Sequence, residues 1–175
     1  MNIIETERLG LRLLTLHDAG FILELLNQPD FIRYIGDKGV RNLADARAYL
    51  EKGPLDSYRR RGFGLYLTSL KRGGTPIGIC GLVKRETLED VDVGFAFMPQ
   101  FAGFGYATES ASAVLAYARR EFGLERVVGI TAPDNYASIA VLGKIGLRFE
   151  RRVRLGRDEE EVKLFGPAAG GGAPN

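Results

Sequence analysis

The chain has 175 residues, of which 45% are hydrophobic and 26% are charged, the composition of one ordinary globular domain. One Cys, one His and a net charge of +2 argue against a disulfide framework, a metal centre and nucleic acid as a partner. The chain contains no apolar run of about 18 residues, so no membrane span is predicted. The N-terminal segment also lacks the apolar core of a signal peptide. We therefore expect a cytoplasmic protein without membrane contact.

The first third of the chain is predicted to hold a strand and two helical stretches. Leucines alternate with other residues over 9–14, which indicates a half-buried strand. Apolar residues then recur at helical spacing until Pro29. Asn42 is placed to cap a longer helical stretch that ends near Arg61, and Gly53-Pro54 should break or kink it.

The remaining two thirds predict a meander, a crossover and a closing hairpin. Predicted strands are 64–70, 76–84, 91–98, 126–132, 147–155 and 159–165, with helices at 107–122 and 135–145. This order is typical of an α+β fold, with a mixed, mostly antiparallel central sheet flanked by helices. The helix between strands 91–98 and 126–132 should make these strands parallel neighbours. We expect one domain over 1–165 and a disordered Gly/Ala/Pro tail over 166–175.

A glycine-rich loop lies between the strand at 91–98 and the helix that follows. It contains Gly103-x-Gly105 and runs directly into the helix at Tyr106-Ala107. Glycines let backbone N–H groups approach a ligand closely, and the N-terminus of the helix adds partial positive charge. The combination suits a bound pyrophosphate.

Several readings of this loop compete. A P-loop requires Lys and Ser/Thr after its last glycine, and the chain has Tyr106 and Ala107 there. A dinucleotide fingerprint is closer, but only one crossover is present and Thr108 stands at its third small position. A nicotinamide-dependent enzyme therefore stays open as a weak alternative. The remaining reading is a turn with no ligand.

The motifs around the loop distinguish these readings. Gln100-x-x-Gly103-x-Gly105 is similar to the acyl-CoA signature of the GNAT (Gcn5-related) N-acetyltransferases. Four further segments resemble the RimJ/RimL branch of that superfamily in the same order along the chain. They are Thr6-Glu7-Arg8-Leu9-x-Leu11-Arg12, Asp92-Val93-Gly94-Phe95, Gly105-Tyr106-Ala107-Thr108-Glu109, and Asn135-x-x-Ser138 followed by Lys144-Ile145-Gly146-Leu147.

The resemblance implies a GNAT fold, acetyl-CoA as cosubstrate and a set of residues that bind it. Two neighbouring strands of that fold splay apart, and pantetheine lies between them. The implied cosubstrate-binding residues are Phe97, Met98, Gln100, Gly103, Phe104, Gly105, Tyr106, Ala107, Asn135 and Lys144. Phe104 departs from the pattern, because relatives usually carry Lys or Arg between the two glycines. The loop should therefore depend on backbone amides and the helix dipole.

Asp92 and Ser138 are the predicted catalytic residues. Asp92 stands where relatives often carry Glu, beside the small residues Gly94 and Ala96, and could act as general base. Its alternative role is that of a strand-edge carboxylate facing solvent. Many relatives use Tyr as the acid for the thiolate, but that position is Leu142 here, which leaves Ser138. The hydroxyl of Ser138 could equally bond the first turn of its own helix.

The sequence thus predicts an N-acetyltransferase that moves an acetyl group from acetyl-CoA to a primary amine by direct attack in a ternary complex. The acceptor could be a small molecule or a protein N-terminus, and the resemblance is compatible with a homodimer. The other function left open is a non-catalytic acyl-CoA sensor. Cys80 lies in an apolar strand and is expected to be an inert core residue. Four aromatic residues could shape the acceptor pocket or belong to the core: Tyr34, Tyr58, Phe63 and Tyr66.

Overall fold

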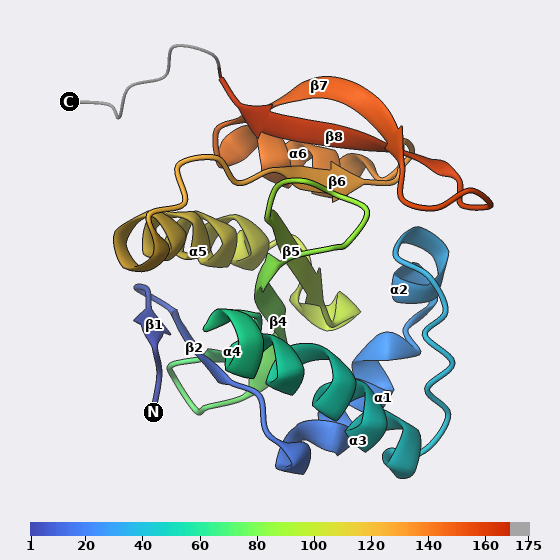
Figure 1. Cartoon of the computed structure of the whole chain (residues 1–175). Coiled ribbons are helices and arrows are strands. Elements are labelled where there is room, and N and C mark those ends of the chain that lie inside the picture. Colours follow the sequence, from blue (N-terminus) through green and yellow to red (C-terminus); the bar gives the residue numbers. More distant parts are fainter. Residues whose placement is uncertain (169–175) are drawn as a thin grey trace.

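The computed structural model describes residues 1–168 and contains two antiparallel sheets (Figure 1). The first sheet has the order β1-β2-β3-β4-β5 and the second has the order β6-β8-β7. Their strands are β1 (Ile4–Glu5), β2 (Leu9–Leu13), β3 (Leu65–Leu70), β4 (Pro76–Val83), β5 (Asp92–Phe97), β6 (Gly129–Thr131), β7 (Leu147–Arg154) and β8 (Glu161–Pro167). This arrangement confirms the predicted α+β class with mostly antiparallel pairing.

Six α-helices surround these sheets within the described residues. They are α1 (Ala19–Leu26), α2 (Pro29–Tyr34), α3 (Leu43–Leu50), α4 (Asp56–Arg61), α5 (Tyr106–Phe122) and α6 (Tyr136–Lys144). Helix α5 packs on β4 and β5, and α6 lies against the second sheet (Figure 1). As predicted, α5 ends at Phe122, and Gly123, which follows it as the cap, has φ = +63°. None of the helices in residues 1–168 is long and apolar enough to cross a membrane.

The two sheets are joined at a single parallel bridge between Asp92 and Val128. There, Val93 N–H donates to the Val128 carbonyl over 2.8 Å, and Val128 N–H donates to the Val91 carbonyl over 3.0 Å. Elsewhere among residues 1–168, β5 pairs only with β4, and β6 only with β8. The predicted parallel neighbours are therefore confirmed at one end, beyond which the strands separate.

The two faces of β5 contribute to different parts of the core. Val93, Phe95 and Phe97 belong to the cluster that includes the buried face of α5. Ala96, on the opposite face, packs into the cluster formed with α1 and α3. This alternation is the ordinary period of two along a strand, and it leaves small residues of β5 facing the N-terminal helices.

Three details of the structure go beyond the sequence-based prediction or differ from it. The predicted break or kink at Gly53-Pro54 takes the form of a π-helical segment, η2 (Glu51–Leu55), which joins α3 to α4. A wider turn accommodates the proline without interrupting the helical path. Helix α2 was not expected, because Pro29 begins a new helix at its first position.

The third difference concerns the C-terminal boundary. β8 continues through Gly166 and Pro167, which pair with Arg148 and Leu147. The predicted domain end at residue 165 is thus two residues too early, because the strand partner remains available there. From residue 169 onward, the predicted tail lies outside the described residues.

Candidate active site

Two pockets meet at the point where β5 and β6 separate. The first, here called the loop pocket, has a volume of about 640 Å³ and is bounded by the glycine loop, α5 and α6. The second, the helix pocket, has a volume of about 380 Å³ and is bounded by the α3–η2–α4 segment, β4 and β5. The residues that line both pockets are Phe31, Tyr34, Ile35, Phe95, Ala96, Asn135 and Ser138. The two pockets are therefore adjacent, and the wall that these residues share is here called the junction.

The loop pocket presents unpaired backbone donors at the N-terminus of α5. Gly103 and Gly105 have φ = +83° and +82°, values that favour glycine. Within residues 1–168, the backbone N–H groups of 103–108 donate to no protein acceptor, whereas Glu109 N–H already bonds the Gly105 carbonyl. Free donors and the dipole of α5 thus lie together at this end of the loop pocket, where the sequence predicts an anion site.

The outer edge of β5 supplies further donors at this junction. Val93 N–H points toward β6, whereas Met98 N–H bonds the Ile77 carbonyl on the β4 side. The direction of the backbone N–H groups alternates from residue to residue along a strand, so the N–H groups of Phe95 and Phe97 point away from β4, as that of Val93 does. They face the gap between the separating strands, where Phe97 lines the loop pocket.

Met98 does not belong to this edge, which corrects the sequence-based prediction. Its amide is occupied by Ile77, and its side chain is buried in the cluster with α1 and α3. Gln100 and Phe104 also do not line either pocket. Gln100 is exposed on the short helix η3 (Pro99–Phe101), and the Phe104 ring stacks on Tyr106 at 5.7 Å. The remaining predicted residues, Gly103, Gly105, Tyr106, Ala107, Asn135 and Lys144, do line the loop pocket.

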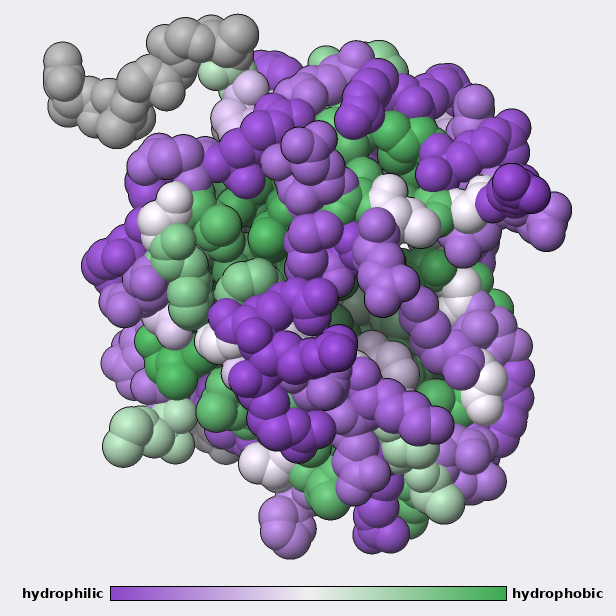
Figure 2. Space-filling model, viewed as in Figure 1, coloured by the Kyte–Doolittle hydropathy of each residue, from purple (hydrophilic) through white to green (hydrophobic). Residues whose placement is uncertain are grey.

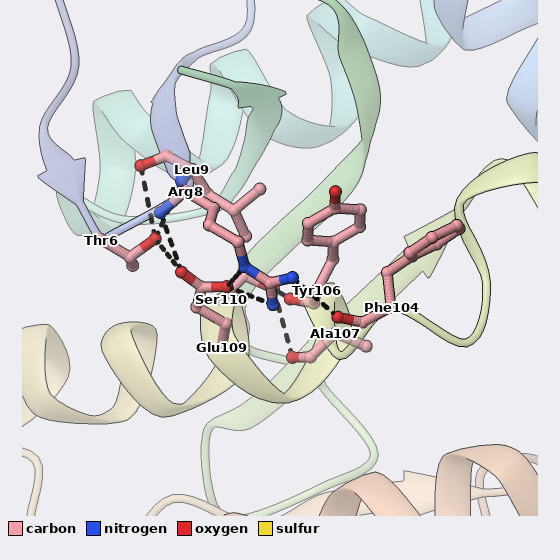
Figure 3. A network of polar contacts seen from close by, with 8 residues as sticks. All are labelled: Thr6, Arg8, Leu9, Phe104, Tyr106, Ala107, Glu109 and Ser110. Atoms are coloured by element: carbon pink, nitrogen blue, oxygen red, sulfur yellow. Dashed lines mark hydrogen bonds and ion pairs between the residues drawn. The ribbon is translucent and has the colours of Figure 1, made fainter. Parts of the chain in front are cut away.

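A polar network holds the glycine loop from behind (Figure 3). The Glu109 carboxylate accepts hydrogen bonds from Thr6 Oγ1 at 2.9 Å, Arg8 N at 3.0 Å and Arg8 Nε at 2.7 Å. Arg8 Nη1 also donates to the Phe104 carbonyl over 2.9 Å, and its guanidinium lies 4.5 Å from the centre of the Tyr106 ring. Burial raises the pKa of Glu109, but the hydrogen bonds from Arg8 and Thr6 outweigh it and lower the pKa.

Sequence reasoning did not connect these residues. In the sequence, Thr6 and Arg8 belong to one motif and Glu109 to another, and no local pattern links the two. The structure brings the two segments together across about a hundred positions of sequence. The guanidinium of Arg8 also places a positive charge next to the glycine loop, at the Phe104 carbonyl, whereas the side chain of Phe104 itself is uncharged.

Asp92 lies in the helix pocket, and its side chain is only 1% exposed. This placement contradicts the alternative of a solvent-facing carboxylate. Its Oδ2 accepts a hydrogen bond from Arg85 Nε at 3.1 Å. Burial raises the pKa of Asp92 to about 6, although the charges of Arg85 and Lys84 oppose the shift. A carboxylate with this pKa is mostly ionised at neutral pH and can accept a proton.

Asn135 and Ser138 begin helix α6 at the junction of the pockets. Asn135 Oδ1 caps the helix by accepting a hydrogen bond from Ser138 N–H at 3.2 Å. Within residues 1–168, neither Asn135 Nδ2 nor Ser138 Oγ has a hydrogen-bond partner. The hydroxyl of Ser138 therefore does not bond its own helix, and both groups remain free to contact a ligand.

Cys80 stands apart from both pockets. It is fully buried in the core, and burial raises the pKa of its thiol to about 12. The thiol is therefore protonated at neutral pH and unsuited to nucleophilic catalysis. Of the four aromatic residues considered for an acceptor pocket, only Tyr34 lines the helix pocket. Tyr58, Phe63 and Tyr66 pack in the core.

Comparison with known proteins places this geometry in a family. Residues 8–148 match the acetyltransferase (GNAT) domain family. The protein YkkB of Bacillus subtilis is 31% identical over 154 residues, which cover 85% of this chain and 87% of YkkB. The crystal structure of a GNAT-family acetyltransferase from Bacillus anthracis superposes with a TM-score of 0.76 at 26% identity, covering 93% of this chain and 96% of the other.

The fold is shared with RimL, a ribosomal L7/L12 α-N-protein acetyltransferase solved in complex with coenzyme A. The TM-score is 0.80 at 19% identity, with 95% of this chain and 97% of RimL covered. These comparisons bear out the resemblance drawn from the sequence motifs.

Proposed function

This chain belongs to the GNAT acetyltransferase family, and from this premise we propose that it moves an acetyl group from acetyl-CoA to a primary amine by direct attack in a ternary complex. The meeting of the loop pocket and the helix pocket carries the proposal. Acetyl-CoA supplies a thioester carbonyl for attack. The amine nitrogen forms the new C–N bond, the C–S bond breaks, and the CoA thiol leaves.

Acetyl-CoA fits the loop pocket. The free N–H groups at 103–108 and the N-terminus of α5 suit the pyrophosphate. Asn135 Nδ2 and the outward N–H groups of β5 suit the amide-rich pantetheine arm. Lys144 lines the same pocket and can offer a positive charge to a phosphate. This set leaves the helix pocket for the amine.

Asp92 is the proposed general base. Gly94 and Ala96 line the helix pocket beside it and leave room for an amine or one relaying water. An α-amine has a pKa of about 8, so a fraction is already neutral at physiological pH and the base removes the proton released on attack. Ser138 Oγ lies at the junction and is proposed to donate a proton to the leaving thiolate.

The decisive experiment measures release of free CoA thiol from acetyl-CoA with and without amine acceptors. Amine-dependent release supports the proposed function. Binding of acetyl-CoA without amine-dependent release would favour the non-catalytic sensor instead. Thermal stability with acetyl-CoA and with NAD provides the preceding step, because a ligand that binds the folded state raises the melting temperature. Stabilisation by NAD alone would contradict the assignment of the loop pocket.

A further inference from the structure

The helix pocket carries more positive charge than its neighbour. Its ionisable lining residues include the cations Lys38, Lys52, Arg61, Lys84 and Arg85, against two acidic residues, Asp56 and Asp92. In Figure 2 the surface is hollowed between α4 and α2, and the rim of this hollow is mostly hydrophilic. The loop pocket has a different balance, with Lys144 as its cation and Asp30 and Asp134 as its acids.

The acidic residues of the helix pocket already have partners. Asp56 lies 3.9 Å from Arg59 and 3.7 Å from Arg60, neither of which lines the pocket. Asp92 is paired with Arg85 through Nε alone. The negative charges in the lining are therefore engaged with cations, and the acidic residue that acts on a lining cation from outside the lining is Glu159, whose charge raises the pKa of Lys38 against the larger effect of burial.

Most of the cations, in contrast, keep free donors. Within residues 1–168, Lys38, Lys52 and Arg61 form no ion pair, and the terminal nitrogens of Arg85 form no hydrogen bond. Lys84 is the exception, since its ammonium group donates to the carbonyls of Arg85 and Leu88. Lys38 and Arg85 lie close enough for the charge of Arg85, after burial, to lower the pKa of Lys38.

Placing like charges together around a concave surface is unfavourable unless an anion is bound there. The cations do not serve the CoA phosphates, because the glycine loop and the α5 N-terminus line the loop pocket only. Asp92 anchors the guanidinium of Arg85 through Nε and leaves the planar pair of terminal nitrogens available. Such a pair matches a carboxylate or a phosphate.

We propose that the acceptor amine carries an anionic group, a carboxylate or a phosphate, which Arg85 and Lys38 bind in the helix pocket, with Lys52 and Arg61 at its rim. This inference rests on the proposed function and specifies its acceptor. The size of the pocket, about 380 Å³, suits a small molecule or the first residues of a peptide.

The test compares acceptors that differ in charge but hardly in shape. The dipeptide amides Ala-Glu-NH2 and Ala-Gln-NH2 share the same N-terminal amine, and phosphoethanolamine with ethanolamine forms the phosphate pair. We expect kcat/KM to favour the anionic member of at least one pair by about tenfold, the effect of one charge-assisted hydrogen bond. The pair that shows the preference identifies the anion as carboxylate or phosphate. A ratio below threefold in both pairs would overturn the proposal.

Variants locate the preference in the pocket. Lys38→Gln and Arg61→Gln should each reduce the ratio of kcat/KM between anionic and neutral acceptors at least threefold. Arg72→Gln provides the control, because Arg72 is exposed in the β3–β4 turn and lines neither pocket. Its ratio should equal that of the parent protein. An equal reduction in all three variants would indicate an effect of net charge and contradict the assigned site.

A binding measurement separates this inference from the function on which it rests. Calorimetry in the presence of CoA compares the acetylated products Ac-Ala-Glu-NH2 and Ac-Ala-Gln-NH2, together with N-acetylphosphoethanolamine and N-acetylethanolamine. Acetylation of all four amines without charge preference leaves the acetyltransferase function intact and rejects the anion site. No acetylation of any amine, with tighter binding of an anionic product, rejects the catalytic function and supports the anion site.

Discussion

Arg85 Nε lies 3.1 Å from Oδ2 of Asp92, and the two side chains differ sharply in exposure, at 35% and 1%. The pair joins a buried carboxylate to a guanidinium that reaches the helix pocket. One interaction thus keeps a buried negative charge compensated and fixes the direction of the arginine. The two effects can be tested separately. Compensation of the buried charge should be visible in the pKa of Asp92, and the orientation of Arg85 should be visible in acceptor binding.

The pH dependence of catalysis should report Asp92. Its pKa is raised to about 6, and a base acts only when deprotonated, so kcat/KM should fall as pH decreases through about 6. Asp92→Asn should lower kcat about a hundredfold or more and remove this decline at low pH, the acidic limb of the pH profile. Thiol release measured from about pH 5 to about pH 8 gives both quantities. A change in kcat within twofold would remove Asp92 from the mechanism.

Replacing Arg85 should move the same acidic limb. The charge of Arg85 lowers the pKa of Asp92 against the effect of burial, so Arg85→Gln should shift the limb to higher pH. Arg85→Lys retains the charge and should shift it less. An unmoved limb in Arg85→Gln, together with intact folding, would show that the limb belongs to another group.

The glycine loop can be tested at Gly105. Its φ of +82° is strained for any side chain, and a Cβ would lie 3.4 Å from Arg8 Nη2. Gly105→Ala should therefore weaken CoA binding about tenfold by disturbing the free N–H groups of the loop. Gly20→Ala on α1 is the control, because nothing lies within 4 Å of the added atom. Calorimetric titration with CoA measures both, and equal affinities would refute the loop assignment.

The network behind the loop should contribute to stability and to CoA affinity. Glu109→Gln removes a charge that accepts three hydrogen bonds from Thr6 and Arg8, and should cost about 1 kcal/mol of folding free energy, given the partial exposure of the pair. CoA affinity should fall severalfold, since Arg8 also fixes the Phe104 carbonyl.

Arg120→Gln on the same helix is the matched control for this network. Arg120 pairs with Glu121 at 3.1 Å on an exposed surface, and its loss should change neither stability nor affinity measurably. A double-mutant cycle that combines Arg8→Gln with Glu109→Gln measures the interaction free energy between Arg8 and Glu109. Additive effects of the two substitutions would show that Arg8 and Glu109 are not energetically coupled and would contradict the network.

Ser138→Ala tests protonation of the leaving thiolate. The hydroxyl has no partner within residues 1–168 and lies at the junction of the pockets. Its removal should lower kcat about tenfold while leaving the affinity for acetyl-CoA nearly unchanged. Ala137→Ser is a suitable control, because it adds a hydroxyl to the adjacent lining position. An unchanged kcat in Ser138→Ala would assign proton donation to solvent or to another group.

Local sequence features were sufficient to predict most of the fold. The strand predicted over 91–98 and the helix predicted over 107–122 correspond to β5 and α5. Patterns of this kind depend on near neighbours, so they can be read without tertiary contacts. The π-helical passage through Pro54 could not be read in this way, because proline favours an ending and only packing keeps the helical path continuous.

The site was predicted unevenly for the same reason. The glycine loop is local in sequence and could be recognised, whereas Met98 was misplaced because its amide is committed to Ile77 on a neighbouring strand. Arg85 and Lys38 were missed, since they lie in loops far apart in sequence and meet only around the helix pocket. Their charge alone did not distinguish them from the other 22 Lys and Arg residues among the 24 in the chain.

The junction of the two pockets has a kinetic consequence. Each pocket has walls of its own, built from the glycine loop and α5 on one side and from α3, η2 and α4 on the other. Under the proposed function each reactant has a pocket of its own, so either one can bind first. The proposed transfer would then take place directly between two molecules bound at the same time, and it would need no covalent acetyl-protein intermediate.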